Sequence, residues 1–500
     1  MGLQSSWVIV KKHAENLKRS VKVLMVNKFF KNRLFPVLTA VLLFLASSLV
    51  TFAAAPPKYI FLFIGDGMGV AQRQVAELQL NAGPNAPAKD QNKRLVMNRM
   101  RAFGVNTTYD SSSMVPDSAS TATAISSGYK TLSGVIGYRE DKTTKTPFIS
   151  EALKEKGYAV GIISSVKIVH ATPAAFYAHI DSRNKYDDIA VQLINSNFDL
   201  FVGGGGSGHF LPTGRKDKRD LYKEAAGKGF TVATTSKDFL ALQPGKRVLA
   251  NLPGDVNDEA LPYAVDRKAD DLPLDKIIAK SIDLLSANKK GFFLMIEEGK
   301  VDWACHANDT GSTIGNMFDL DRAVAAALEF QKTHKDTLVI VTGDHECGGL
   351  GLSMGQEYRV SPEIFLNQKM SFEVADAKVA QILKNENEPR EGIFKLAADF
   401  GLTNLKDSEK AAIEKAIADQ KANLSKDQSI ALYGGYKPVS MTFCRLMNTR
   451  ANLFWTSYVH TGIPVMTSAE GTGAEKFAGY QDDTDICKAL NSITSAGLKW

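Results

Sequence analysis

The 500-residue sequence lacks internal repeats and low-complexity tracts, and it is poor in cysteine. Its four cysteines allow three full disulfide pairings, and the sequence does not choose among them. None lies near the end of the apolar leader, so a lipoprotein anchor is not indicated. The glycine run at residues 203–206 is not followed by Gly-Lys-Ser/Thr, so it is not a phosphate-binding P-loop. We interpret it as a tight turn after a strand.

Most of the chain also lacks a surplus of positive charge, although the net charge of the whole is +6. Residues 1–53 hold eight Lys/Arg and one acidic residue, so the other residues have a net charge of −1. A nucleic-acid partner therefore has no electrostatic support and is not expected. The 44% hydrophobic and 23% charged residues are ordinary values that predict a globular chain with a large core.

The leader has the pattern of a secretory signal. Basic residues up to Arg33 precede an apolar run at 34–52, and the small residues 53–55 follow. This predicts a signal peptide over residues 1–55. An uncleaved membrane anchor is the alternative, because the apolar run is almost long enough to span a bilayer.

The charged part of this leader is unusually long. Met25 would begin a more usual signal, so residues 1–24 are interpreted as sequence that could be untranslated. We expect the mature chain, residues 56–500, to be exported to the periplasm or the extracellular space. No stable membrane association is expected after cleavage.

Five continuous apolar runs are typical of parallel strands buried on both faces of a sheet. They lie at residues 59–64, 159–163, 200–202, 292–296 and 337–341. With helical segments between them, they predict an α/β fold: a three-layer sandwich with a large, mostly parallel central sheet flanked by helices. Residues 352–440 have helical period and charged faces instead. They predict a helical insertion within the domain of residues 56–500, acting as a lid, a crown or an interface.

A helix of small residues is expected over 119–127, between Pro116 and Gly128. Ser118 therefore lies at a helix N-terminus, where outward N–H groups and the helix dipole favour an anion. The alternative is that Asp117 or Ser118 only caps the helix, which is common at such positions.

Acidic and histidine side chains recur at the ends of predicted strands. They are Asp66, His170, Glu297, Asp302, His306, Asp344, His345 and His460. Parallel topology brings strand ends to one edge of a sheet, and buried carboxylates there need compensating cations. The mixed oxygen and nitrogen set suits Zn²⁺, whereas an oxygen subset suits Mg²⁺. With Ser118 as nucleophile and Arg183 as a phosphate clamp, this predicts two-metal phosphoryl transfer.

The segment Asp117-Ser118-Ala119 within its small-residue helix resembles the signature of the alkaline phosphatases. Six further blocks carry the resemblance, at residues 64–69, 170–175, 182–183, 297–306, 342–345 and 460–462. It spans about residues 59–350 and 440–500. The resemblance implies an exported homodimer that hydrolyses small phosphate monoesters through a phosphoseryl intermediate, with two Zn²⁺ and one Mg²⁺.

The resemblance also implies a role for each site residue. Ser118 would be the nucleophile, and Arg183 would bind the substrate phosphate with Asp117 orienting it. The implied ligands are Asp302, His306 and His460 for the first zinc; Asp66, Asp344, His345 and Ser118 for the second; and Asp66, Thr172 and Glu297 for magnesium. Glu298 is the less suitable magnesium ligand, because the five-residue spacing to Asp302 selects Glu297.

Some positions near the implied site leave alternatives open. His170 and Trp303 stand beside the magnesium ligands, where certain bacterial members have Asp and Lys, so the third metal is less secure. Cys305 and Cys347 each lie within two residues of a zinc ligand and would form either a disulfide or packing thiols, of which we favour the second. A phosphodiesterase or sulfatase-like hydrolase and a non-catalytic phosphate-binding protein are the competing functions. No sulfatase modification motif surrounds Ser118.

Overall fold

The computed structural model describes residues 55–82, 93–385 and 389–500. The expected signal peptide and the alternative start at Met25 lie outside these residues.

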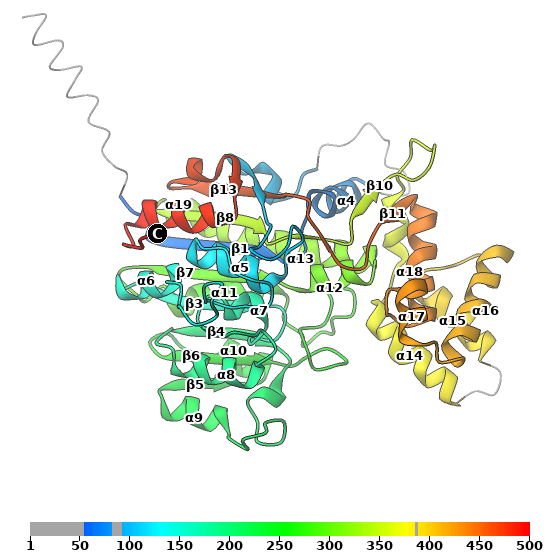
Figure 1. The fold of residues 1–500 in the computed structure, drawn as a ribbon, viewed down its shortest axis with the longest axis horizontal. Coiled ribbons are helices and arrows are strands. Elements are labelled where there is room, and N and C mark those ends of the chain that lie inside the picture. The colour runs from blue at the N-terminus through cyan, green and yellow to red at the C-terminus, as the bar shows by residue number, and fades with distance from the viewer. Residues whose placement is uncertain (1–54, 83–92, 386–388) are drawn as a thin grey trace, which may run out of the picture. The chain divides into compact units, whose positions relative to one another are not determined.

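A ten-stranded sheet has the order β14-β2-β13-β8-β1-β7-β3-β4-β6-β5 (Figure 1). Its parallel strands are β8 (Thr337–Gly343), β1 (Tyr59–Gly65), β7 (Phe292–Glu298), β3 (Ala159–Ser164), β4 (Leu200–Gly204), β6 (Arg247–Leu252) and β5 (Phe230–Ala233). The predicted mostly parallel sheet is confirmed.

One edge of the sheet has mixed direction. Strand β13 (Val465–Gly471) runs antiparallel to both β8 and β2 (Ala102–Thr107), and β14 (Gly479–Asp482) runs parallel to β2. The sequence did not indicate these strands. In β2 buried residues alternate with exposed or half-buried ones, so the strand has no continuous apolar run.

The apolar runs form central strands because each supplies side chains to both faces. In β1, Tyr59, Phe61 and Phe63 pack in one buried cluster, whereas Ile60 and Leu62 pack in another. Successive side chains of a strand point to opposite faces, so an all-apolar strand needs a covering layer on each side. The protein is therefore a three-layer α/β sandwich, as predicted.

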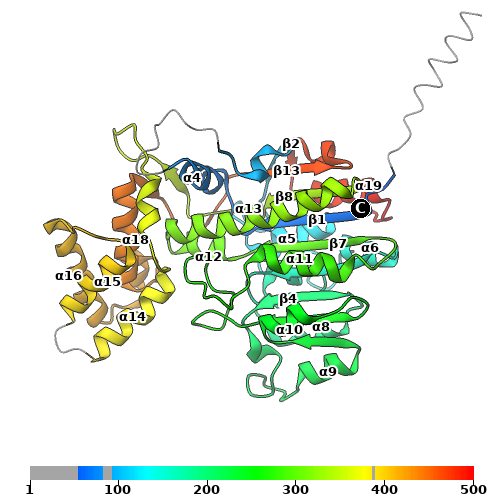
Figure 2. The same ribbon diagram turned by 180° about the vertical axis from the view of Figure 1, so that it is seen from behind.

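Helices supply the two covering layers (Figures 1 and 2). The first cluster contains residues from α4 (Val70–Leu80), α10 (Ser236–Ala241), α11 (Leu274–Leu285), α12 (Lys300–His306) and α13 (Thr310–Thr333). The second contains residues from α5 (Ser118–Ser127), α6 (Ile149–Glu155), α7 (Ala171–Ala174), α8 (Tyr186–Asn195), α9 (Leu221–Gly227) and α19 (Thr484–Thr494). Short 3-10 helices are η1 (Val96–Arg99), η2 (Ser207–His209), η3 (Pro362–Asn367) and η4 (Ala474–Phe477).

Five helices lie together beside the sheet (Figures 1 and 2). They are α14 (Phe372–Asn385), α15 (Arg390–Phe400), α16 (Asp407–Lys421), α17 (Lys426–Tyr433) and α18 (Pro438–Ala451). The helical period expected within residues 352–440 is matched by these helices. Within the described part of the chain, no helix is both long enough and apolar enough to cross a membrane.

A two-stranded ribbon joins the chain segments that precede and follow these helices. Strand β10 (Leu350–Leu352) pairs antiparallel with β11 (Leu453–Trp455). Strand β11 lies outside the central sheet, and its Phe454 side chain is 48% exposed. A three-residue apolar segment carries too little pattern to distinguish a core strand from a surface ribbon.

Candidate active site

Three neighbouring strands bring the candidate residues to one edge of the sheet. Asp66 follows β1, Asp344 follows β8, and Glu297 is the penultimate residue of β7. Ile64 of β1 is paired in register with Glu297 on one side and with Thr342 on the other. Parallel strands end at a common edge, so the carboxylates converge although they are far apart in the sequence.

Asp66, Asp344 and His345 form one compact and fully buried group. The Nε2 atom of His345 lies 3.2 Å from Asp66 Oδ1 and 3.2 Å from Asp344 Oδ2. The backbone N–H of Gly67 donates to Asp344 Oδ1 at 3.1 Å and fixes that carboxylate. Neither carboxylate oxygen of Asp66 has a hydrogen-bond partner among the described residues. Such orphaned oxygens fit a site for a cation.

Asp302, His306 and His460 form a second group. The Nδ1 atom of His306 lies 2.6 Å from the carbonyl oxygen of Tyr458, and Nδ1 of His460 lies 2.8 Å from that of Pro116. A ring nitrogen facing a carbonyl must carry a proton, which leaves each Nε2 free as a ligand atom.

The free ligand atoms of this second group point at one another. The two Nε2 atoms are 3.2 Å apart, and Asp302 Oδ2 is 3.3 Å from that of His306. Lone pairs at these distances repel unless a positive charge lies among them. Burial lowers the pKa of His306, but Asp302 raises it more, to about 9, so a proton is held there when no metal is bound. The donor set fits Zn²⁺.

His460 reaches this group by a route that the sequence did not indicate. It lies on the two-residue strand β12 (His460–Thr461), which pairs antiparallel with β9 (Glu346–Cys347) outside the central sheet. The residue opposite His460 is Cys347, two positions after His345. The prediction that His460 follows a strand of the central sheet is therefore wrong, although it does join the other ligands.

Asp66, His170 and Glu297 form a third buried group, which shares Asp66 with the first. Thr172 Oγ1, His170 Nδ1 and Glu297 Oε1 are buried and have no hydrogen-bond partner within the described residues. His170 occupies the N-cap position of the short helix α7, so Thr172 lies in the first turn of that helix. Three oxygen-bearing side chains with one histidine fit Mg²⁺ when waters complete the shell.

Three of these carboxylates, those of Asp66, Asp344 and Glu297, are not stable as anions by themselves. Burial raises the pKa of Asp344 to about 8 and the pKa of Glu297 to about 7. The pKa of Asp66 lies well above its usual range because of burial and the nearby Asp344, Asp302 and Glu297 carboxylates. Cations held among them would return these groups to the ionised form, which is the form that binds metal.

Ser118 is the first residue of α5 and is 2% exposed. Its Oγ lies 3.2 Å from Nε2 of His345, the atom that also contacts Asp66 and Asp344. The small side chains of α5 let the helix pack completely, since all ten of its residues are buried. Gly128 ends the helix at φ 77°, where a Cβ would lie 2.2 Å from the Trp500 ring nitrogen.

Arg183 is held beside the serine by Asp117. Its Nη1 donates to Asp117 Oδ2 at 2.8 Å, and its Nη2 lies 3.3 Å from His170 Nε2. The other oxygen of Asp117 accepts from the N–H of Ser120, which caps α5. Asp117 therefore caps the helix, as one interpretation had it, and orients Arg183 as well.

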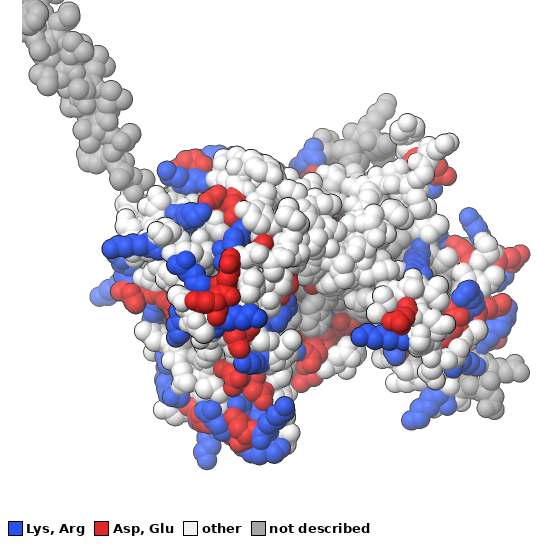
Figure 3. All heavy atoms as spheres, viewed as in Figure 1, with Lys and Arg blue, Asp and Glu red and all other residues white. Residues whose placement is uncertain are grey.

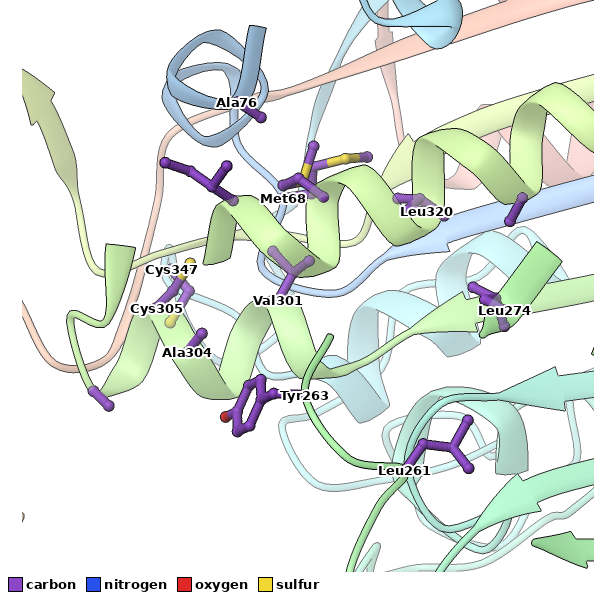
Figure 4. Packing of buried hydrophobic residues seen from close by; sticks show 14 of the residues in the cluster. Met68, Ala76, Leu261, Tyr263, Leu274, Val301, Ala304, Cys305, Leu320 and Cys347 are labelled. Carbon is purple, nitrogen blue, oxygen red and sulfur yellow. The ribbon is translucent and has the colours of Figure 1, made fainter. Parts of the chain in front are cut away.

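The remaining predicted residues lie around these groups. The Trp303 ring meets the His170 ring edge-on, with centroids 5.9 Å apart. Glu298 points away from the ligands and accepts from Ser165 and Asn316, because successive residues of β7 face opposite sides. Cys305 and Cys347 are free thiols in the buried cluster (Figure 4). The packing alternative is therefore confirmed.

Two supporting carboxylates escaped the sequence analysis. Glu346 is buried between the ligand segments and accepts from Gln72 Nε2 at 2.6 Å and from the N–H of Gly349 at 3.0 Å. Asp110 accepts from the N–H groups of Ser112 and Ser113, at 2.7 Å each, before the nucleophile segment. Asp110 could have been found, because Asp followed by serines is a turn signature. Glu346 directly follows His345. Its place in the segment after β8, beside two predicted ligands, was the signal that could have indicated it.

Comparisons with known proteins agree with this geometry. A family model described as Alkaline phosphatase matches residues 57–496. Alkaline phosphatase 4 of Bacillus subtilis (strain 168) is 32% identical over 448 residues, which are 88% of this chain and 89% of that protein. The crystal structure of Thermus thermophilus alkaline phosphatase is 26% identical, with a TM-score of 0.77 over 90% of this chain and 93% of that one. A mutant of TAB5 alkaline phosphatase, with Mg bound in its M3 site, is 26% identical, with a TM-score of 0.62 over 88% of this chain and 99% of that one.

Proposed function

The chain belongs to the alkaline phosphatase family, whose members are metal-dependent phosphoric monoester hydrolases, and from that premise we propose how its own residues perform the reaction. Hydrolysis proceeds through a phosphoseryl intermediate on Ser118, at a site for two Zn²⁺ and one Mg²⁺. The observation that carries the proposal is the 3.2 Å contact of Ser118 Oγ with His345, a member of the first ligand group, which shares Asp66 with the third group. A serine that only capped α5 would not need such surroundings.

The ligand sets follow the three groups. The first zinc is assigned to Asp302, His306 and His460; the second to Asp66, Asp344, His345 and Ser118; and magnesium to Asp66, Thr172 and Glu297. His170 and Trp303 border the magnesium ligands. When bound, the ions lower the pKa of the serine hydroxyl and of water and neutralise charge on the ester oxygens.

The protein's own groups position the ester and the nucleophile. Arg183 presents two N–H groups to two non-bridging phosphate oxygens, held in place by Asp117. Ser118 Oγ, once deprotonated, forms a bond to phosphorus as the bond to the alcohol oxygen breaks, and the alcohol leaves with a proton. The N-terminus of α5 faces the anionic phosphoserine. Water then attacks phosphorus, releasing inorganic phosphate and restoring Ser118.

A comparison of ester classes tests the function. We expect kcat/KM for p-nitrophenyl phosphate to exceed that for bis(p-nitrophenyl) phosphate and for p-nitrophenyl sulfate by on the order of 10³-fold or more. A phosphate monoester is a dianion, and its charged oxygens can bind both Arg183 and cations held by the ligand groups. The diester and the sulfate ester each carry a single negative charge and bind these positive groups less strongly. Faster hydrolysis of the diester or of the sulfate would assign the protein to the competing class.

The homodimer is a proposal supported by exposed apolar side chains. Val70, Phe103 and Val105 are 43%, 40% and 36% exposed and line a hollow of about 400 Å³ with Met466. A broad area of the described surface in Figure 3 carries no charged side chain. Exposed apolar patches, such as the one that Val70, Phe103 and Val105 form, are typical of contacts with other chains.

Oligomeric state checks the dimer. A two-fold interface buries the same apolar patch on both subunits, so a charge placed there is desolvated twice, and we expect Phe103→Glu to weaken the dimer by on the order of 10²-fold in sedimentation equilibrium. Leu240→Glu on α10 is the control, since Leu240 is also exposed, at 47%, but lies outside this hollow. A wild-type protein that sediments as a monomer would refute the proposal.

Export also remains a proposal. It is supported by the basic and apolar pattern of residues 1–55 in the sequence. Location in the periplasm or outside the cell would suit an enzyme that releases phosphate from external esters.

A further inference from the structure

A cavity of about 530 Å³ lies next to the metal ligands, between α12 and the helices beside the sheet. Its volume is in the range of small-molecule sites. Two turns of α14 form one wall, the segment before α18 forms another, and α12 forms the third. The lining side chains that bear on its chemistry are Trp303, His306, Phe372, Glu373, Asp376, Tyr436 and the cationic Lys437.

This cavity is continuous with the reaction site through two side chains. His306 belongs to the second ligand group, 3.2 Å from His460, and also lines the cavity. Trp303 contacts His170, which in turn lies 3.3 Å from Arg183. In-line attack by Ser118, which lies against His345, sends the leaving oxygen to the side away from His345. The alcohol part of the ester then faces the cavity.

The aromatic walls of the cavity are fixed by a buried lysine. Lys300 is completely buried and donates to Asp255 at 2.7 Å and to Glu373 at 3.2 Å. Its ammonium group also lies 4.8 Å from the centre of the Trp303 ring. Lys300 thereby links α12 to α14 and forms an ion pair with Glu373, which leaves that carboxylate unavailable to a ligand. The walls of the cavity are therefore held in position before any ligand binds.

Asp376 is the carboxylate that remains for a ligand. Within the described chain it forms no salt bridge, and its Oδ1 has no hydrogen-bond partner. Lys437 and Ser440 face it and lower its pKa, but burial raises the pKa more, to about 6, so Asp376 is ionised at alkaline pH. Phe372 and Tyr436, with ring centroids 5.7 Å apart, complete a surface of aromatic rings beside a carboxylate. Such a surface attracts an ammonium group.

We propose that this cavity binds the leaving group of the substrate and selects phosphate monoesters of alcohols that carry an ammonium group. The inference rests on the proposed function, because it concerns the alcohol part of the same ester. The aromatic rings of Phe372, Tyr436 and Trp303 receive the cation, and Asp376 balances its charge. Esters with an anionic alcohol part are disfavoured by Asp376.

A pair of isosteric esters tests the selection. Choline phosphate carries a quaternary ammonium, and 3,3-dimethylbutyl phosphate has carbon in place of its nitrogen. We expect Asp376→Asn to lower the ratio of kcat/KM for choline phosphate to kcat/KM for the neutral ester by about tenfold, a change typical of one partly desolvated charge contact. The different reactivities of the two alcohols cancel when this ratio is compared between variants.

Matched variants separate this effect from a general one. Asp427→Asn removes the same charge from α17, where the exposed Asp427 does not line the cavity, and should leave the ratio unchanged. Tyr436→Leu should lower the ratio in the same direction as Asp376→Asn. An unchanged ratio in both cavity variants, with phenyl phosphate still hydrolysed, would overturn the inference alone. Failure of the wild-type protein to hydrolyse phenyl phosphate would overturn the proposed function and the inference with it.

Discussion

Replacing Ser118 with alanine is expected to lower kcat for p-nitrophenyl phosphate by on the order of 10⁴-fold or more, as loss of a covalent nucleophile does in other hydrolases. The Ser118 oxygen is the one hydroxyl placed against His345 in the described residues, and alanine leaves no atom to accept the phosphoryl group. Initial rates with purified protein measure the loss. Acid quenching of wild-type protein with labelled substrate should trap phosphoserine at residue 118.

Ser126→Ala is the matched control for this change. Ser126 lies in the same buried helix, and its hydroxyl donates to the Thr123 carbonyl without reaching any ligand group. We expect it to retain turnover near that of the wild type. Full turnover in Ser118→Ala, or label on another residue, would remove the nucleophile from the proposed mechanism.

Removal of the metal ions is expected to abolish turnover and to change how stability depends on pH. In the metal-free protein, the raised pKa values of Asp344, about 8, and of Glu297, about 7, mean that the folded state holds protons which the unfolded chain releases near pH 4. Their stabilising contribution is complete below about pH 4 and is lost as the pH rises to about 8. Thermal unfolding of chelator-treated protein across this range measures the effect.

The metal-loaded protein supplies the comparison, since cations there compensate the ionised carboxylates. We expect its unfolding temperature to vary little over the same pH range, and turnover to return when Zn²⁺ and Mg²⁺ are restored. Asp66→Asn should lose more bound metal than Glu298→Gln, because Asp66 belongs to two ligand groups and Glu298 to none. Equal metal content in the two variants, or unchanged turnover after chelation, would contradict the assignment.

The sequence predicted the part of the site that follows directly from strand topology. Asp66, Glu297 and Asp344 stand at or near the ends of continuous apolar runs, and such runs are typical of central parallel strands. Once those strands are adjacent, their ends must meet. The i, i+4 spacing of Asp302 and His306 likewise needs only a helix after β7.

The rest depends on contacts between distant segments that no local pattern encodes. The His460 strand is two residues long and exists because it pairs with β9. Lys300 gives no signal in the sequence, since an isolated lysine is normally solvated, and its burial becomes evident only when Asp255 and Glu373 surround it. Strand β2 was missed for a related reason: one of its faces is open to solvent.

The hydrogen bond from His460 to the carbonyl oxygen of Pro116 joins residues 344 positions apart. A ribosome therefore has to deliver all of residues 116–460 before His460 of the proposed zinc site can meet its partners. Partial translation products would expose carboxylates and imidazoles without a complete coordination shell, and these would bind metal weakly and in the wrong arrangement. The proposed metallation would consequently be a late event in maturation, and it would fix the segment around His460 to the rest of the chain.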